Sequence, residues 1–415
     1  MKQSGKSARL DRRAFLRRGA LASLGVGLLP LTGGAQPWPG VRAEVRRYAP
    51  LGHTGVQMSD ISFGSSRLHA GEEALVLHAY DRGINYFDTA ESYTGGDAEV
   101  TLGNALRGKR DKVSIASKVQ TSASTRKETL MAALEGSLRR LHTDYVDVYF
   151  NHAVNDVRRL QNPEWYEFTE HAKRQGKIRA TGMSGHAGQL IPCLDYALET
   201  GRVDVILAAY NFGQDPAFYQ RFTRAFDFVA RQPDLPRVLR QAQARGVGVI
   251  AMKTLMGARL NDMRPFEQGG ATFAQAAFRW VLSNADVDGL IISMTGADRI
   301  DEYLSASGWR SAAYDDLPLL QRYARMHGTS YCRHGCNDCA GACPYGVPIP
   351  DVLRTRMYAQ DYGDMQLARS EYAQLGVGAS ACLTCAQHPC ASACSYGLPI
   401  DTLLAPLHQM LAQRV

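Results

Sequence analysis

Eight short apolar runs, separated by segments of helical periodicity, are the feature of this sequence that most constrains its fold. Each run except the last is followed by a helical pattern before the next begins, which is typical of parallel strands joined by helical crossovers. Eight is also the number of strands that closes a barrel. The runs occupy residues 61–64, 84–88, 113–118, 145–152, 178–184, 203–208, 247–253 and 287–293, with helices expected at 126–141, 163–175, 190–199 and 272–283.

We therefore predict an α/β chain whose main domain is a (β/α)8 TIM barrel. A doubly wound open sheet is the structural alternative, although no Gly-x-Gly-x-x-Gly motif opens a helix after the first run. A hairpin is expected at 48–59 and a closing helix at 402–413. The predicted organisation is a signal peptide at 1–35, a linker at 36–46, the barrel at 47–307, a connector at 308–330 and a cysteine-rich module at 331–415.

The N-terminal segment holds most of the net charge. Residues 1–35 carry seven basic residues and one acidic residue, so they contribute +6 of the chain's +7. The remaining residues are close to neutral and give no argument for nucleic-acid binding.

The same segment resembles a twin-arginine (Tat) export signal. Arg12-Arg13 is followed by Phe-Leu, then by an apolar stretch at 20–31 that is too short to span a bilayer, and by small residues at 33–35. The alternative is an uncleaved basic tail. The resemblance implies export of the folded chain to the periplasm, with the Tat machinery as a partner and no membrane span in the mature protein.

Four residues with catalytic chemistry lie at or just after the ends of three consecutive runs. In (β/α)8 barrels the reactive groups lie at the carboxyl ends of the strands. Reduction of a carbonyl needs a proton donor, and a nearby ammonium group makes a tyrosine a better donor because it lowers the tyrosine pKa. A carboxylate can hold that ammonium in place, and a neutral histidine can donate a hydrogen bond to the substrate oxygen. The alternative is that these polar groups only cap strands and solvate loops. The four residues are Asp88, Tyr93, Lys118 and His152.

The segments around these residues resemble the aldo/keto reductase family. The residues that carry the resemblance are the Phe-Asp-Thr-Ala-Glu-Ser-Tyr motif at 87–93, Ser-Lys at 117–118 and Asp-Tyr-Val-Asp-Val-Tyr at 144–149 leading to His152. It covers residues 47–307 and implies a catalytic tetrad of Asp88, Tyr93, Lys118 and His152, with Tyr93 as general acid and base. It also implies NADP(H) or NAD(H) as cofactor and a small carbonyl or alcohol as substrate.

The cofactor side departs from the family's pattern. The family has Ser-Asn after strand five and a glutamine near strand six, whereas this chain has Ser184-Gly185 and Ala208. The resemblance leaves four candidate cofactor residues: Ser184, Tyr210 as a stacking face for the nicotinamide, and Lys253 and Arg299 for the phosphates. The alternative is that Lys253 and Arg299 are ordinary solvated surface charges.

Eight of the nine cysteines form two tight groups, and Cys193 in an apolar helix is expected to pack in the core. Both groups resemble the bacterial ferredoxin motif, in which three close cysteines bind one [4Fe–4S] cluster and the fourth binds the other. Zinc and disulfides are the alternatives. The resemblance implies two clusters, one bound by Cys332, Cys336, Cys339 and Cys394 and the other by Cys382, Cys385, Cys390 and Cys343.

The two modules together suggest an oxidoreductase that exchanges electrons with a redox partner protein. Three interpretations remain open. One is a carbonyl–alcohol oxidoreductase coupled to the clusters. Another is an exported electron-transfer or binding protein whose barrel has lost activity, and the third is a cytoplasmic reductase with structural clusters.

Overall fold

The computed structural model describes residues 43–214, 218, 232–256, 263–267, 270–312, 314–327, 332, 336–361, 365–376 and 378–412. The chain divides into two units, 1–35 and 36–415, and all described residues belong to the second. The predicted signal peptide and most of the predicted linker therefore lie outside the described residues.

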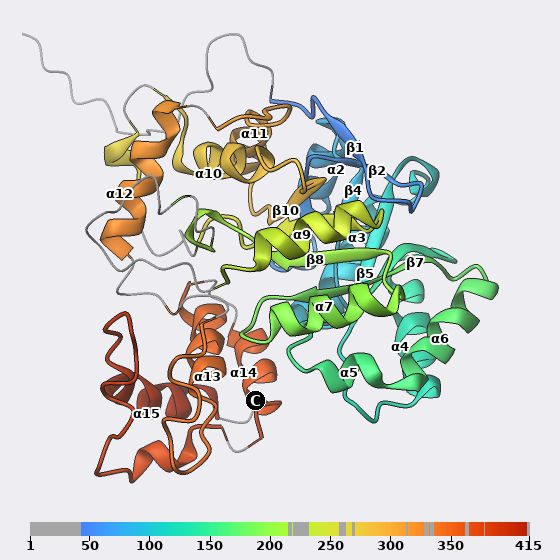
Figure 1. Cartoon of the computed structure of the whole chain (residues 1–415). Helices are drawn as coiled ribbons and strands as arrows, with labels where there is room; N and C mark the ends of the chain where they lie inside the picture. Colours follow the sequence, from blue (N-terminus) through green and yellow to red (C-terminus); the bar gives the residue numbers. More distant parts are fainter. Residues whose placement is uncertain are drawn as a thin grey trace, which may run out of the picture. The chain divides into compact units, whose positions relative to one another are not determined.

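Eight parallel strands close into a barrel, as predicted (Figure 1). Each strand pairs with its neighbours in sequence, and the last pairs with the first, so the open-sheet alternative is excluded. The strands are β3 (Ile61–Gly64), β4 (Tyr86–Asp88), β5 (Ser114–Val119), β6 (Val146–Asn151), β7 (Ile178–Gly185), β8 (Val205–Ala209), β9 (Gly248–Met252) and β10 (Gly289–Ser293).

The predicted hairpin precedes the barrel and packs into its amino-terminal end. Strands β1 (Tyr48–Pro50) and β2 (Gln57–Ser59) pair antiparallel. The hairpin contributes Leu51, Val56 and Met58 to the cluster of side chains that fills the barrel interior. Gly52 has φ +50°, and a Cβ there would lie 2.4 Å from the carbonyl oxygen of Gly246, so this turn requires glycine.

Helices surround the barrel and bury the outward faces of the strands. Helix α10 begins with a capping box in which Thr272 and Gln275 satisfy each other's backbone N–H groups. The helices are α2 (Glu73–Asp81), α3 (Asp97–Ala105), α4 (Lys127–Arg140), α5 (Val157–Gln161), α6 (Pro163–Arg174), α7 (Leu190–Thr200), α9 (Leu235–Ala244), α10 (Phe273–Leu282) and α11 (Ala297–Leu304).

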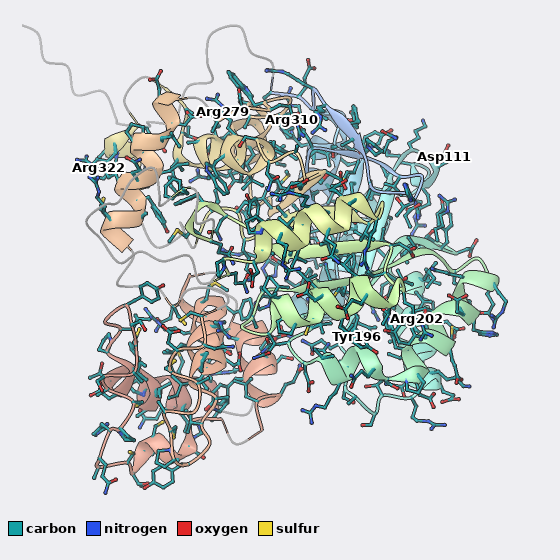
Figure 2. The ribbon with its side chains drawn as sticks, in the orientation of Figure 1. Asp111, Tyr196, Arg202, Arg279, Arg310 and Arg322 are labelled. Carbon is teal, nitrogen blue, oxygen red and sulfur yellow. The ribbon has the colours of Figure 1, made fainter. Side chains whose placement is uncertain are left out.

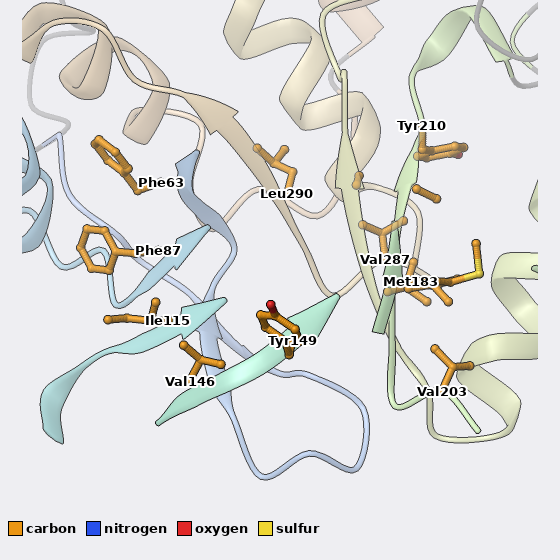
Figure 3. Close-up of a cluster of buried hydrophobic side chains, with 14 of the residues drawn as sticks. Phe63, Phe87, Ile115, Val146, Tyr149, Met183, Val203, Tyr210, Val287 and Leu290 are labelled. Carbon is orange, nitrogen blue, oxygen red and sulfur yellow. The ribbon is translucent and has the colours of Figure 1, made fainter. Parts of the chain in front are cut away.

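Alternation along the strands separates two cores. Inward-facing residues such as Ala116 and Val148 fill the barrel, whereas outward-facing ones such as Phe87, Ile115 and Tyr149 pack under the helices (Figure 3). Beyond the first residues of β6 and β7, the even-numbered positions of β4 to β7, such as Tyr86, Phe150 and Ala180, face inward. The side chains at positions 88, 118, 152 and 184 therefore continue the inward faces at the carboxyl ends of these strands.

The connector packs on the outside of the barrel. Arg279 of α10, labelled in Figure 2, pairs with Asp316 at 3.4 Å, and its guanidinium lies 4.1 Å from the ring centre of Trp309. Asp316 ends a 3-10 turn, and helix α12 (Leu317–His327) follows it. In the described parts of the chain, no helix is both long and apolar enough to cross a membrane.

The described part of the C-terminal module consists of helices and turns. Its elements are α13 (Ile349–Arg356), a π-helical turn η7 (Met357–Asp361), α14 (Met365–Ala373), a 3-10 turn η8 (Ser380–Leu383) and α15 (Ile400–Leu411). Helix α15 is the predicted closing helix. These helices enclose a separate apolar core that includes Ile349, Val352, Ile400 and Leu404.

An internal repeat joins each cysteine group to a helix. The sequences Cys-Pro-Tyr-Gly-Val-Pro-Ile at 343–349 and Cys-Ser-Tyr-Gly-Leu-Pro-Ile at 394–400 have closely similar backbones. Gly346 and Gly397 both have φ +72°, and Pro348 and Pro399 cap α13 and α15 with φ −78° and −77°. The repeated motif therefore places the last cysteine of each group immediately before a helix.

Candidate active site

A buried ion pair lies at the carboxyl ends of β4 and β5. Lys118 Nζ lies 2.5 Å from Asp88 Oδ1 and donates a second hydrogen bond to the carbonyl oxygen of Thr89 at 2.6 Å. Asp88 and Lys118 are each 1% exposed. Burial raises the pKa of Asp88 and lowers the pKa of Lys118, and their close contact opposes both shifts. The carboxylate therefore favours the charged form of the ammonium against the effect of burial.

Tyr93 and His152 complete the predicted tetrad. Lys118 Nζ lies 4.8 Å from the centre of the Tyr93 ring, and the rings of Tyr93 and His152 meet edge to face with centres 5.6 Å apart. Tyr93 begins the turn η1 (Tyr93–Gly96), whose residues Thr94 and Gly95 have φ +49° and +69°. The Thr94 hydroxyl donates to the carbonyl oxygen of Leu68 at 2.8 Å and so anchors this strained turn.

The environment of His152 keeps its imidazole neutral. Burial lowers its pKa well below the ordinary value, and the positive charges of Lys118, Arg159 and Lys253 lower it further. Its Nδ1 makes no hydrogen bond to any described residue. A neutral imidazole in this position can donate a hydrogen bond to a substrate oxygen.

Arg159, which the sequence did not indicate, holds the loop that carries His152. Its guanidinium donates to the carbonyl oxygens of His152 and Ala153 and to Asn151 Oδ1, at 2.6, 2.9 and 3.0 Å. Ala153 has φ +51°, and its N–H donates to Ser184 Oγ at 2.9 Å. Arg159 and Ser184 together fix a strained loop, and no spacing or motif in the sequence could have revealed the arginine.

Three of the four candidate cofactor residues lie at the carboxyl ends of strands. Ser184 is buried near the end of β7. Lys253 directly follows β9, and its Nζ lies 5.1 Å from the ring centre of Tyr358. Arg299 lies in the first turn of α11, after β10, and pairs with Glu302 at 2.7 Å.

The Tyr210 ring lies on the outward side of β8, which faces the helices. The ring packs against Trp280 of α10 with centres 5.3 Å apart, and the hydroxyl accepts a hydrogen bond from Asn284 at 3.0 Å. In β8, Val205 and Leu207 face into the barrel, so Ile206, Ala208 and Tyr210 face the helices. This orientation argues against the stacking role predicted for Tyr210.

Comparison with known proteins settles the family. The sequence matches the model of the aldo/keto reductase family over residues 61–268, half of the chain. The chain belongs to this family. It is therefore an oxidoreductase of a family that uses NAD(P)H, and the match includes all four tetrad residues.

Relatives of known name agree with this assignment. The chain is similar to L-galactose dehydrogenase of Arabidopsis thaliana, with 24% identity over 62% of this chain and 86% of that protein. It is 23% identical to L-glyceraldehyde 3-phosphate reductase of Escherichia coli O157:H7, over 67% of this chain and 92% of the relative. The holo form of aldo-keto reductase AKR11C1 from Bacillus halodurans has a similar fold, with a TM-score of 0.53 and 22% identity over 66% of this chain and 95% of that structure.

The first set of cysteines comes together from both ends of the module. Burial, followed by the neighbouring Cys332, Cys336 and Cys394, raises the pKa of Cys339 to about 12. The pKa of Cys332 is raised to about 11, mainly by burial; the positive charge of Arg354 opposes this shift, and Cys336 and Cys394 contribute to it. Cys394, the last cysteine of the second group in sequence, therefore lies near the cysteines of the first group.

The second set shows the reciprocal arrangement. Burial and then Cys343, Cys390 and Cys385 raise the pKa of Cys382 to about 11. Cys343, Cys382, Cys385 and Cys390 also line one small cavity. All nine cysteines are described, and none of them forms a disulfide bond; among the described residues, no three histidine, cysteine or acidic side chains form a site for a metal ion.

Proposed function

We propose that the barrel interconverts a carbonyl compound and its alcohol by hydride transfer with NAD(P)(H), and that Tyr93 exchanges a proton with the substrate oxygen. The observation that carries this proposal is the buried Lys118 ammonium, held 2.5 Å from Asp88 and 4.8 Å from the centre of the Tyr93 ring. A constellation of this kind matches the needs of carbonyl reduction, because negative charge develops on the substrate oxygen as the hydride arrives.

Each tetrad residue has a distinct role in this proposal. Tyr93 donates its proton to the oxygen during reduction and takes one back during oxidation. Lys118 stabilises the negative charge left on the Tyr93 oxygen, and Asp88 keeps Lys118 charged and in place. Neutral His152 donates a hydrogen bond to the same substrate oxygen, and Arg159 keeps the His152 loop in position.

The chain's own groups suit a nicotinamide nucleotide, which supplies or accepts the hydride when bound. The buried Thr254 hydroxyl, just after β9, has no hydrogen-bond partner among the described residues and is available to a ligand. Lys253 and Arg299 place positive charge after β9 and β10, and the amino end of α11 favours a phosphate. Ser184 lies at the end of β7, between these groups and the His152 loop.

Replacing Tyr93 with phenylalanine tests the proposal. We expect kcat for the reduction of an aldehyde by NADPH to fall about 10²- to 10⁴-fold, because the acid–base group is lost. Tyr86→Phe is the matched control: Tyr86 is also buried, and its hydroxyl has no described partner, so activity should stay within about twofold. Equal, measurable activity in wild type and Tyr93→Phe would contradict the role of Tyr93. No reduction by either protein would favour the alternative, an exported electron-transfer or binding protein whose barrel has lost reductase activity. The outward orientation of Tyr210 is the observation that favours that alternative.

The C-terminal module is proposed to hold two [4Fe–4S] clusters that pass electrons singly to or from a partner protein. Cysteine thiolates bind such clusters, one to each iron. Support comes from the neighbourhoods of Cys339 and Cys382, which match the two crossed ligand sets of the ferredoxin pattern. Anaerobic purification should give about eight irons and eight sulfides per chain. Zinc, or no metal, would overturn this part of the proposal.

Export to the periplasm is a further part of the proposal. The Arg12-Arg13 motif supports it, and folded export suits a chain whose cofactors are inserted before transport. N-terminal sequencing of the mature protein should find a start close to residue 36. An intact N-terminus in the cytoplasmic fraction would favour the cytoplasmic reductase instead.

A further inference from the structure

The C-terminal module contacts the turn and strand ends that carry the tetrad. Helix α14 reaches η1: a Cβ on Gly95, two residues after Tyr93, would lie 2.9 Å from the Gln366 amide nitrogen. At the other end of α14, Glu371 accepts a hydrogen bond from Gln120 at 2.6 Å, and Gln120 lies two residues after Lys118. One helix of the module therefore spans from the Tyr93 turn to the end of β5.

The π-helical turn η7 reaches the opposite side of the site. The Tyr358 hydroxyl lies 3.3 Å from Nε2 of His186, which follows β7. Lys253, which follows β9, has its ammonium over the Tyr358 ring. The turn η7 and the helix α14 thus contact the ends of four barrel elements: η1, β5, β7 and β9.

Glu371 is the charged group that the module contributes to these contacts. Its carboxylate is partly buried: burial raises its pKa, and the hydrogen bond from Gln120 and the positive charges of Lys253 and Arg159 oppose this shift; the same two cations act on His152. Glu371 Oε1 accepts from Gln120, whereas Oε2 accepts no hydrogen bond from any described residue. One carboxylate oxygen is therefore fixed in position, and the other remains available as an acceptor close to the tetrad.

From these contacts we infer that the module forms part of the substrate site and that Glu371 binds a hydroxyl group of a polyhydroxylated substrate. The inference rests on the proposed function. The groups that the module brings to these contacts, Tyr358, Gln366 and Glu371, are all polar, and the second carboxylate oxygen of Glu371 can accept a hydrogen bond from a substrate hydroxyl, which an alkyl chain cannot supply. Glu371 is thus a substrate-binding residue, and removal of its charge changes selectivity between substrates.

The test compares two aldehydes of equal chain length on anaerobically purified holoprotein. Glyceraldehyde carries two hydroxyl groups, and propanal carries none. In Glu371→Gln, which retains an oxygen acceptor for Gln120, we expect kcat/KM for glyceraldehyde to fall about 10- to 100-fold, mainly through KM, because a hydrogen bond to a charged acceptor is lost. For propanal, kcat/KM should stay within about threefold.

Gln374→Ala is the matched control. Gln374 lies at the end of the same helix and donates to the same Gln120 side chain, but it is exposed and uncharged. If Glu371 only docks α14 on Gln120, Glu371→Gln, which keeps an acceptor for that hydrogen bond, should change kcat/KM little or equally for both aldehydes, and any effect of Gln374→Ala should also be equal for both; this pattern would overturn the inference. No loss with glyceraldehyde in Glu371→Gln would overturn it as well.

Calorimetric titration with galactitol separates this inference from the proposed function, because it needs no turnover. Binding to the wild type that Glu371→Gln weakens about 10-fold or more supports the inference even if no aldehyde is reduced. Equal affinities, or no binding to the wild type, overturn it while the Tyr93→Phe result decides the proposed function independently.

Discussion

Substitutions in the Asp88–Lys118 pair allow the effect of the pair on the free energy of unfolding to be separated from its effect on catalysis. Both side chains are 1% exposed, and their charged atoms lie 2.5 Å apart. Lys118→Met leaves the Asp88 carboxylate buried without its partner, and removal of one member of a buried pair costs about 3–5 kcal/mol. Asp88→Asn combined with Lys118→Met removes both charges and should recover at least about 2 kcal/mol, because no unpaired charge is buried. The single and the double variant should both have very low activity, since both lack the ammonium beside Tyr93.

The stability deficit of Lys118→Met should depend on pH. Burial raises the pKa of Asp88 in the folded protein, and loss of Lys118 removes the charge that opposes this shift. A raised carboxyl pKa contributes stability below the unfolded value of about 3.9, and this contribution is lost as the pH rises through the folded value. The deficit relative to wild type, measured by urea unfolding followed by circular dichroism, should be smaller at pH 5 than at pH 7.5. A deficit below about 1 kcal/mol at pH 7.5, or a double variant no more stable than Lys118→Met, would refute the reasoning.

Three further predictions concern residues near or behind the site. Arg159→Ala should lower kcat/KM about 10- to 100-fold by freeing the His152 loop, whereas the exposed neighbour Arg158→Ala should have little effect in the same steady-state assay; equal effects would contradict the positioning role. Because burial holds the pKa of His152 well below its ordinary value, the imidazole is neutral above that lowered pKa, and kcat/KM should show no His152 titration between pH 6 and 8. A change of kcat/KM with pH in this range that disappears in His152→Gln would contradict this prediction. Cys193, whose pKa burial raises to about 12, should resist iodoacetamide at pH 8 in the native protein, as followed by mass spectrometry of its peptide; rapid labelling would show that the thiol is accessible.

Local pattern predicted the elements that form the barrel. The apolar run at 61–64 is β3 without any change, and the other seven runs differ from their strands by a few residues at the ends. Strand alternation explains why Asp88, Lys118 and His152 come together, since each continues an inward face. The same alternation shows why Tyr210 faces α10, a consequence visible in the sequence once Val205 and Leu207 are taken as inward-facing.

Contacts between distant segments could not be predicted. Gln120 and Glu371 are 251 residues apart, and only tertiary packing brings them within hydrogen-bonding distance. Arg159 lies in an ordinary helix, and its role depends on three backbone and side-chain oxygens that a one-dimensional pattern does not reveal. The cysteine spacing, by contrast, carried long-range information, because the ferredoxin pattern already implied that Cys394 lies near Cys339.

The central claim is that the barrel transfers a hydride directly between a nicotinamide and a carbonyl carbon. The most direct test is a single incubation of the anaerobically purified protein with aldehyde and NADPH or NADH deuterated at C4, followed by mass spectrometry of the alcohol. The account predicts one deuterium on the former carbonyl carbon, and far less of this deuterated alcohol in the same time when Tyr93 is replaced by phenylalanine. If the alcohol contains no deuterium, whichever face of C4 carried the label, the electrons reach the substrate by another route. That result would contradict the account.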